Sequence, residues 1–269
     1  MPELPEVETV ARQLEPLLSG RRLRRARLLD RRLGTPPVAS LVGHQVERVF
    51  RLGKQVAFEL SRRGRPRFMA VHLRMTGRLI WQDGRRRSPP DHKHLRARFD
   101  LDGGRLLFFD PRRFGTIAVV DTPEEIAPCG VDPLSAELTP GALAGLLRGS
   151  RQAIKAWLLR QDRLVGLGNI YACEILFRAG VAPDRAAGRL RRTDVERLHR
   201  ALRDVLTRAI ESCGTTFSDF QDARGVSGSY QRYLGVYARE GEPCPACGRP
   251  VRRIVQQQRS TFYCPGCQR

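Results

Sequence analysis

The sequence predicts an α+β protein with three consecutive parts, and three observations support this prediction. Hydrophobic residues alternate with polar ones between about residues 43 and 120, which is the period of strands. After a stretch that contains Pro123, Pro128, Pro133 and Pro140, the period becomes helical. Two Cys-x-x-Cys pairs follow near the C-terminus. With 269 residues, the chain is long enough for more than one packed core.

The first part is expected to be an antiparallel β-sandwich or barrel that follows one helix. The helix is predicted over Glu6–Leu18, where apolar residues form one stripe, and Gly20 ends it. Alternating patterns at Val56–Leu60 and Leu95–Leu101 predict strands, and Asp102–Gly104 is a strong hairpin turn signal. Further strands are expected at Arg67–Leu73 and Thr116–Val120.

The second part is expected to be helical. Helices are predicted at Leu143–Leu147, Ala153–Leu159 and Ile170–Ala179. A capping box at Thr193–Glu196 predicts the start of a longer helix. The polar, glycine-containing segment Asp219–Gly235 is expected to be a mobile loop. The predicted domains are therefore residues 1–130, 131–235 and 236–269.

The charge balance indicates a polyanionic partner. The chain has 48 basic and 28 acidic residues, a net charge of +20 and a pI near 11.1. Such a field favours nucleic acid first and an anionic membrane second, although a general basic bias of the proteome is an alternative cause. The chain contains no run of about 18 apolar residues, so no membrane span is predicted. The N-terminus also lacks the apolar core of a signal peptide.

Lysine is rare in this chain, because all but three of its basic residues are arginine. The three lysines are Lys54, Lys93 and Lys155. Arginine keeps its proton in the working pH range, whereas a lysine can release one when its surroundings lower its pKa. A retained lysine is therefore a candidate for proton transfer, although three positions could also remain by chance.

The cysteine pattern predicts one zinc site. Two pairs are separated by 16 residues, a spacing typical of four thiolates around one tetrahedral ion. The predicted ligands are Cys244, Cys247, Cys264 and Cys267. A four-thiolate site has no open position, so this zinc should be structural. Two disulfides are the alternative, but the scattered positions of the other three cysteines favour a reduced, cytosolic protein.

Several motifs together resemble one known family. They are the segment Met1–Thr9, the run Pro111–Gly115, the turn Gly168–Tyr171 and the four-cysteine finger. From residue 2 to residue 269, the chain resembles bacterial formamidopyrimidine-DNA glycosylase (8-oxoguanine-DNA glycosylase). The resemblance implies an N-terminal β-sandwich with a leading helix, a helix-two-turn-helix domain and a zinc-finger hairpin. It also implies a monomer that binds damaged double-stranded DNA in the bacterial cytoplasm, at the nucleoid.

The resemblance implies four catalytic residues. Removal of Met1 would leave Pro2 with a secondary amine, which the family uses as the nucleophile. Glu3 is then the proton donor, Lys54 serves the elimination step, and Arg259 assists the last elimination. Without the resemblance, Pro2 would simply stiffen the N-terminus and Lys54 would be a solvated strand residue.

The resemblance also implies residues that contact DNA. Met75, Arg112 and Phe114 correspond to the trio that fills the gap left by an everted base. Without the motif, Met75 and Phe114 would be assigned to the core. Further DNA contacts are implied for His92, Arg151, Lys155 and Asn169.

The sequence therefore predicts a bifunctional DNA glycosylase and abasic-site lyase. Its expected lesions are oxidised purines such as 8-oxoguanine paired with cytosine, and ring-opened formamidopyrimidines. Three alternatives are an endonuclease VIII-like enzyme for oxidised pyrimidines, a non-catalytic protein that binds damaged DNA, and a zinc-ribbon RNA-binding protein. Three residues depart from the family pattern: Ser150 replaces a common lysine, and Cys213 and Ala238 each replace a usual glycine.

Overall fold

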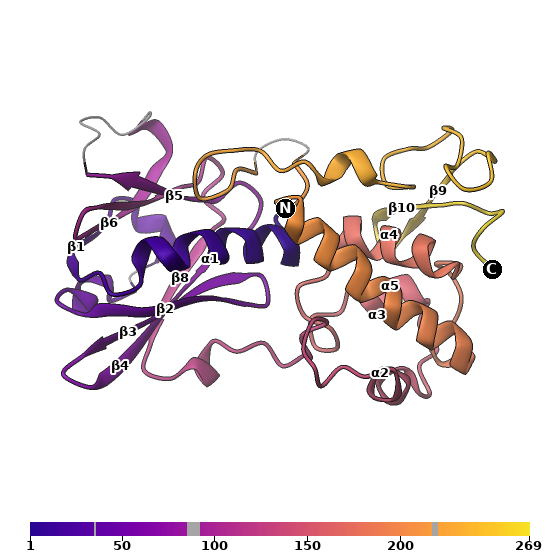
Figure 1. The fold of residues 1–269 in the computed structure, drawn as a ribbon, viewed down its shortest axis with the longest axis horizontal. Coiled ribbons are helices and arrows are strands. Elements are labelled where there is room, and N and C mark those ends of the chain that lie inside the picture. The colour runs from indigo at the N-terminus through magenta and orange to yellow at the C-terminus, as the bar shows by residue number, and fades with distance from the viewer. Residues whose placement is uncertain (35, 85–91, 217–219) are drawn as a thin grey trace. The chain divides into compact units, whose positions relative to one another are not determined.

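The computed structural model of the chain describes residues 1–34, 36–84, 92–216 and 220–269. Two compact units are formed, and Figure 1 shows the elements of both in chain order. The first unit comprises residues 1–127 and 212–231, and the second comprises residues 128–211 and 232–269. Across the described ranges, no helix combines the length and the apolar character needed to cross a lipid bilayer.

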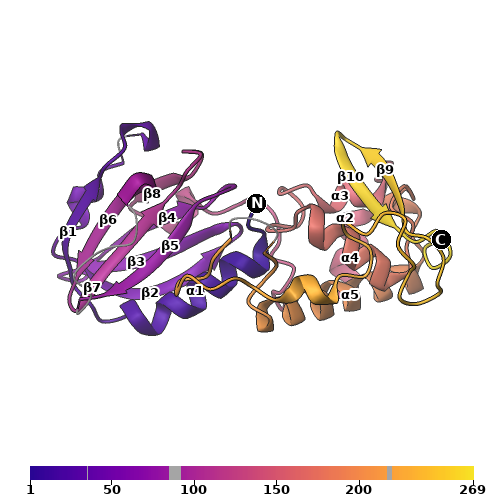
Figure 2. The same ribbon diagram turned by 90° about the horizontal axis from the view of Figure 1, so that it is seen from above.

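The first unit contains two antiparallel four-stranded sheets (Figure 2). One sheet has the order β1-β6-β7-β5 and the other the order β2-β3-β4-β8. The strands are β1 (Leu23–Leu28), β2 (Gln45–Leu52), β3 (Gln55–Arg62), β4 (Arg65–His72), β5 (Arg78–Asp83), β6 (Leu95–Leu101), β7 (Gly104–Phe109) and β8 (Thr116–Val120). One apolar core takes buried side chains from both sheets, among them Phe58 and Phe108. The predicted β-sandwich is therefore confirmed.

Helix α1 (Leu4–Leu18) completes this core. It begins two residues before the predicted start, because Pro5 occupies the first turn, where a missing N–H costs nothing. Val7, Val10 and Leu14 are fully buried and belong to the sandwich core. The packing of the apolar stripe on the sheets thus fixes the chain that leads into the helix.

The second unit contains the helices α2 (Pro140–Leu147), α3 (Ile154–Leu158), α4 (Asn169–Ala179) and α5 (Arg192–Glu211). Helix α4 packs against α5. The two turns between α3 and α4 are closed by Gln161, whose Nε2 donates to the carbonyl oxygens of Leu159 and Leu167. The Gln161 Oε1 atom accepts from the amide of Gly166. One side chain therefore satisfies three backbone polar groups of this connection.

The start of α5 differs from the prediction. The helix begins at Arg192, so Thr193 lies inside it and does not cap it. The Asp194 carboxylate accepts instead from the backbone N–H of Arg191, and it also pairs with Arg185 and Arg197. Asp194 satisfies the helix N-terminus because a carboxylate in the first turn is favoured by the helix dipole.

The C-terminal hairpin consists of β9 (Arg252–Gln256) and β10 (Arg259–Tyr263). Gln257 and Gln258 form its two-residue turn, with φ angles of 47° and 60°. Positive φ at both positions is the geometry of a type I′ turn, whose twist matches that of the strands. Strand β10 packs on α4, so the hairpin belongs to the second unit.

Six short 3₁₀ helices lie between these elements in the described ranges: Arg31–Leu33, Val38–Leu41, His92–His94, Pro123–Glu125, Ala187–Arg189 and Tyr230–Tyr233.

The segment after α5 returns to the first unit. Phe220 and Ala223 are buried in the sandwich core, and the Ala223 carbonyl accepts from the amide of Trp81 in β5. The Gln13 side chain holds the same segment through Asp222 and the amide of Ala223. The part of the predicted mobile loop around Phe220–Ala223 is therefore packed against the sandwich.

Candidate functional site

The N-terminus is fixed at the start of α1. Pro2 is buried, and Glu3 is only 3% exposed. The Glu6 carboxylate accepts from the backbone N–H of Glu3 at 2.8 Å and from that of Thr215 at 2.7 Å. A Cβ on Gly214 would lie 2.8 Å from Glu6, so the returning segment approaches as closely as a glycine allows. Glu6 therefore anchors the segment that carries Pro2 and Glu3.

Lys54 lies in the turn between β2 and β3, and two contacts place this turn at the same end of α1. Val49 donates to the carboxylate of Glu15, near the C-terminal end of α1, and Arg51 pairs with Glu8 at 2.7 Å near its N-terminal end. Strand β2 thus runs antiparallel to the helix. Lys54, three residues beyond Arg51, therefore lies towards the residues that precede α1.

His72 is a site residue that the sequence did not single out. It pairs with Gln55 across β3 and β4, next to Lys54. Burial, with added repulsion from Arg74 and Lys54, lowers the pKa of His72 to about 4. Its Nδ1 atom accepts from the backbone N–H of Arg74, so the neutral ring carries its proton on Nε2. The available signal was the position of a histidine directly before the Leu73–Gly77 turn.

Met75, Arg112 and Phe114 lie on two loops that we call the paired loops: Leu73–Gly77 and Asp110–Gly115. Met75 is 42% exposed and Phe114 is 49% exposed, so neither belongs to the core. The Arg112 guanidinium lies over the ring of Phe114, with 4.7 Å between the Cζ atom and the ring centroid. The loops join β4 to β5 and β7 to β8, which connects one sheet to the other. Large exposed apolar side chains at such a position are typical of a binding surface.

His92 begins a short 3₁₀ helix, but its side chain lies outside the described part of the structure. Arg151, before α3, is exposed and can meet a ligand. Arg259 is exposed at the start of β10.

Lys155 lies in α3, and its side chain binds the hairpin. The sequence predicts a contact with phosphate, but the side chain is completely buried. Its ammonium group donates to Thr261 Oγ1 at 2.6 Å and to the Ser260 carbonyl at 3.1 Å. These are the residues that follow Arg259 in β10, so Lys155 holds the hairpin.

Asn169 contributes to the same attachment. Its Nδ2 atom donates to the Ser260 carbonyl at 2.9 Å, so this oxygen accepts from Asn169 and Lys155 together. Asn169 is the first residue of α4 and remains partly exposed. The base of the Arg259 side chain is thereby fixed to the helices of its own unit.

The four predicted zinc ligands come together. The sulfur atoms of Cys244 and Cys267 are 3.8 Å apart, and those of Cys247 and Cys264 are 3.4 Å apart. All four sulfurs lie within 4.8 Å of one another. Tetrahedral Zn²⁺ with Zn–S bonds of about 2.3 Å requires sulfurs about 3.8 Å apart, so the residues fit this ion. The site holds one structural zinc.

Glu174 in α4 is a second attachment that the sequence did not reveal. Its buried carboxylate accepts from three consecutive amides, those of Gly235, Val236 and Tyr237, at 2.8 to 3.0 Å. Burial raises the pKa of Glu174, although these hydrogen bonds oppose the change. The segment that leads into the finger is thus tied to the same helix as β10.

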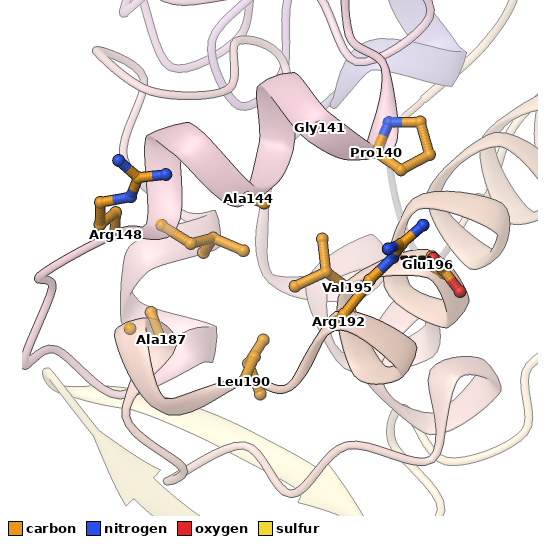
Figure 3. Close-up of a pocket in the computed structure, with 11 residues that line it drawn as sticks. Pro140, Gly141, Ala144, Arg148, Ala187, Leu190, Arg192, Val195 and Glu196 are labelled. Carbon is orange, nitrogen blue, oxygen red and sulfur yellow. Dashed lines mark hydrogen bonds and ion pairs between the residues drawn. The ribbon is translucent and has the colours of Figure 1, made fainter.

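A separate groove of about 480 Å³ lies between α2 and the start of α5 (Figure 3). Apolar side chains such as Leu190 and Val195 line it, together with the charged side chains of Arg148 and Arg192. None of the predicted catalytic residues lines it. The groove is therefore distinct from the candidate site.

Comparison with protein families gives three matches. Residues 1–117 match the formamidopyrimidine-DNA glycosylase N-terminal domain, and residues 129–221 match the formamidopyrimidine-DNA glycosylase H2TH domain. Residues 241–269 match the zinc finger found in FPG and IleRS. A formamidopyrimidine-DNA glycosylase of Symbiobacterium thermophilum is 44% identical, with 100% of this chain and 89% of the relative covered. A Burkholderia pseudomallei relative of the same name is 43% identical, with both chains covered completely.

Solved structures agree with these matches. The MutM (FPG) protein of Thermus thermophilus aligns with a TM-score of 0.87 and 40% identity, over 99% of this chain and 98% of the other. A mutant of the Lactococcus lactis FPG in complex with a Fapy-dG containing DNA aligns with a TM-score of 0.87 and 30% identity, over 99% of both chains. Since all three of its domains match and its relatives align over the whole chain, the protein belongs to the formamidopyrimidine-DNA glycosylase family.

Proposed function

We propose that the protein is a bifunctional DNA glycosylase and abasic-site lyase of base excision repair, which excises oxidised purines such as 8-oxoguanine and formamidopyrimidines. The observation that carries the proposal is the N-terminus, where Pro2 and Glu3 are buried at the start of α1 and the backbone of Glu3 is held by Glu6. A catalytic group must be held in one geometry to be effective, and this anchoring supplies it. Family membership identifies the reaction that such a terminus serves.

Pro2 is the proposed nucleophile. After removal of Met1, its nitrogen is a terminal secondary amine, and terminal amines have a much lower pKa than lysine side chains. The nitrogen bonds to C1′ of the damaged nucleotide while the bond from C1′ to the base breaks and the base leaves with that electron pair. The proton of the attacking amine passes to Glu3, which gives a proton to the ring oxygen. The C1′–O4′ bond then breaks, and the nitrogen lone pair freed by the first transfer forms the C=N bond of an iminium ion.

Elimination follows from the iminium charge. The positive nitrogen makes the C2′–H acidic, and loss of this proton expels the 3′ phosphate as the C3′–O bond breaks. Loss of a second proton, from C4′, expels the 5′ phosphate in the same way. Lys54 is proposed to act at the first of these steps, in agreement with its placement towards the residues before α1, and Arg259 at the second.

The paired loops are proposed to hold the duplex open. Removing a base from the stack leaves a gap and an orphaned partner. The exposed Met75 and Phe114 have the apolar bulk to fill that gap, and Arg112 can donate hydrogen bonds to the orphaned cytosine. His92, Arg151 and Asn169 are proposed phosphate contacts, and the net charge of +20 favours the approach of DNA.

The proposed lesion range centres on oxidised purines, and oxidised pyrimidines are the second candidate. A specific observation keeps this candidate, because a solved Lactococcus lactis Fpg that aligns with a TM-score of 0.86 was bound to DNA containing an oxidized pyrimidine. The two candidates are separated by comparing single-turnover excision of 8-oxoguanine and of thymine glycol from otherwise identical duplexes. Faster excision of thymine glycol would reverse the order proposed here.

The test of the chemistry is borohydride trapping on an 8-oxoguanine duplex, followed by mass mapping of the adduct. We expect a covalent adduct on residue 2 of the Met1-trimmed protein. Pro2→Gln should abolish it, because a bulky second residue retains Met1 and the proline nitrogen is gone. Pro5→Ala is the matched control and should keep the adduct, since the nitrogen of Pro5 is an amide.

Absence of any adduct from the trimmed protein would favour the non-catalytic DNA-binding alternative. An adduct mapped to another residue would overturn the assignment of Pro2. The intact mass of the purified protein should be measured first, because it reports directly whether Met1 is removed. We also propose that the protein works on nucleoid DNA in the bacterial cytoplasm.

A further inference from the structure

We propose that Thr76 and Asp110 are positioning residues that lock the paired loops together, so that Met75, Arg112 and Phe114 enter the duplex as one rigid wedge. This inference rests on the proposed function. It assigns a role to two buried residues outside the proposed catalytic set. Both residues lie within the first unit.

The two loops meet at one buried hydrogen-bonded cluster. The hydroxyl of Thr76 donates to Asp110 Oδ1 at 2.5 Å, and its oxygen accepts from the backbone N–H of Arg112 at 3.3 Å. The second carboxylate oxygen, Asp110 Oδ2, accepts from the backbone N–H of Gly115 at 2.7 Å. Thr76 is 6% exposed and Asp110 is 0% exposed, so water does not compete for these contacts.

The cluster restrains each wedge residue through its neighbour. Met75 directly precedes Thr76, and Arg112 is held by its own amide. Phe114 lies between Arg112 and Gly115, whose two amides are both bonded to the cluster. Because Met75 and Phe114 are nearly half exposed, their own side chains have little packing to hold the loops. The backbone contacts of Thr76 and Asp110 therefore supply the rigidity.

The surrounding backbone leaves little freedom for another arrangement. A Cβ on Gly115 would lie 2.5 Å from Phe108 Cζ and 3.1 Å from Asp110 Oδ2, so only glycine fits this approach. On the opposite loop, the amide of Gly77 donates to the carbonyl of Leu73 at 2.9 Å and closes the turn around Met75. Both loops are thus tight turns, and the cluster is the side-chain link between them.

A second contact holds the outer side of the Asp110–Gly115 loop. Arg113 pairs with Asp30 at 2.8 Å, and Asp30 also pairs with Arg96 at 3.4 Å. The Nε atom of Arg96 donates to the backbone carbonyl of Asp110 at 2.8 Å. Arg113 has a φ of 58°, a conformation that a non-glycine residue keeps only when its surroundings enforce it. The loop is therefore tied on both sides of Arg112.

The proposal predicts a substrate-dependent defect. Thr76→Val keeps the shape of the side chain but removes the donor to Asp110 and the acceptor for Arg112. Loss of such a buried hydrogen bond corresponds to about tenfold in an equilibrium. We expect the half-saturating enzyme concentration on an 8-oxoguanine:cytosine duplex to rise about tenfold. The saturated single-turnover rate should change by less than about threefold, since the chemical groups are untouched.

A second substrate isolates the wedge. When the same lesion lies opposite a tetrahydrofuran abasic analogue, no orphaned base remains and the helix is already open. On this duplex we expect Thr76→Val to differ from wild type by less than about threefold. Thr76→Ser is the matched control, because it keeps the hydroxyl, and it should match wild type on both duplexes.

Asp110→Asn is the second variant, in case Thr76→Val lowers stability. An amide has one acceptor oxygen, so it can serve either the Thr76 hydroxyl or the Gly115 amide but not both. It should reproduce the selective loss on the paired duplex, with both variants measured below their melting temperatures. Equal losses on the two duplexes, or an equal defect in Thr76→Ser, would overturn the proposal. Failure of the proposed function is distinguishable, because wild-type protein would then excise neither substrate.

Discussion

The paired loops and the zinc hairpin each present exposed side chains, but they are fixed by opposite chemistry. In the first unit, a buried carboxylate and a hydroxyl receive backbone N–H groups, and the loops are held by their own sandwich. In the second unit, a buried ammonium group donates to backbone and hydroxyl oxygens, and four thiolates share one ion. The loops need no metal, whereas the hairpin depends on one.

This difference predicts different modes of failure. A lost contact in the paired loops should loosen one turn, because the core of both sheets remains intact behind it. A lost contact in the hairpin removes part of a small core, which contains the ligands Cys244 and Cys264 together with Val236 and Val251. Small domains with few apolar residues depend on such a metal for folding. The hairpin should therefore fail as a whole.

The largest effect is expected from removing a zinc ligand. Cys264→Ser should reduce the zinc content from one ion per chain to none, because zinc binding supplies about 10 kcal/mol or more to a finger of this kind. Affinity for a lesion duplex should fall at least about a hundredfold, as the hairpin with Arg259 unfolds. Metal analysis and binding titration measure the two quantities.

The control for this experiment is Cys173→Ala. Cys173 is buried within the same core cluster but is not one of the four clustered ligands. It should retain one zinc per chain and the wild-type affinity. If Cys264→Ser kept both its zinc and its affinity, the metal would not be what organises the hairpin. Calorimetry of Cys264→Ser should leave the transition of the first unit in place.

The next largest effect is expected from Lys155→Met. The substitution keeps an unbranched side chain but leaves the Ser260 carbonyl and Thr261 Oγ1 without their donor. Loss of one partner in a buried, charged hydrogen-bonded group costs about 2–4 kcal/mol. Denaturant unfolding of the second unit should show this loss. The final elimination should also slow relative to the first, because Arg259 belongs to the hairpin and loses its position when the hairpin loosens.

Arg151→Met is the matched control, since it removes an exposed cation from the same region. It should leave the unfolding free energy unchanged to within about 0.5 kcal/mol. Equal stability of Lys155→Met and wild type would contradict a structural role for the buried lysine. In that case, direct phosphate binding by Lys155 would become the better explanation of any defect.

A smaller effect is expected from His72, at the base of the first paired loop. Because its folded pKa is about 4 and its ordinary value is 6.5, the folded state binds fewer protons than the unfolded state between these values. The stability that the neutral ring contributes is therefore complete above pH 6.5 and is lost as the pH falls towards 4. Allowing for partial exposure, the loss is about 1–2 kcal/mol.

His72→Asn tests this dependence. The Asn Oδ1 atom can replace Nδ1 as the acceptor for the amide of Arg74 but does not titrate. Between about pH 7 and pH 4, the free energy of unfolding of the first unit should fall less with decreasing pH in the variant than in wild type. Parallel curves would show that His72 is not buried as a neutral ring.

Local patterns predicted most of the helices and five of the eight sandwich strands, because the causes of these elements are local. The turn at Asp102–Gly104 joins β6 and β7 as expected, with Gly103 at a φ of 79°. The four zinc ligands also came together as their spacing required. The return of Phe220 to the sandwich core was not predictable, since it depends on contacts with residues far away in the sequence. The packing of such a segment depends on which distant surface buries it, and the hydrophobic period of the segment does not show this.

The site residues also divide into those predictable from local sequence and those that depend on distant contacts. Pro2 and Glu3 could be proposed from sequence because the chemistry of a terminal amine is local, and their anchoring supports that proposal. The contacts of Lys155 with the hairpin could not be predicted, because its burial arises only when β10 packs on the helices. Asp110 and Thr76 escaped notice for the same reason, since both are ordinary loop residues until the two loops meet.

The smallest effect is expected from relieving backbone strain at one residue in each unit. Cys213 in the first unit and Ala238 in the second have φ angles of 56° and 62°, a conformation that favours glycine. The amide of Arg239 donates to the carbonyl of Val236, so Ala238 is the third residue of a turn that favours glycine. A left-handed conformation costs a residue with a Cβ about 1–2 kcal/mol, and glycine recovers this at about 0.5–1 kcal/mol of chain entropy.

Cys213→Gly and Ala238→Gly should therefore each stabilise their own unit by about 0.5–1 kcal/mol. Ala144→Gly is the control, because this exposed residue of α2 has helical dihedrals and the same change should cost about 1 kcal/mol. Calorimetry that resolves the two units can assign each gain. If Cys213→Gly raised the temperatures of both unfolding transitions equally, the two units would unfold as one. The loops held by a carboxylate and the hairpin held by a metal would then not differ in stability.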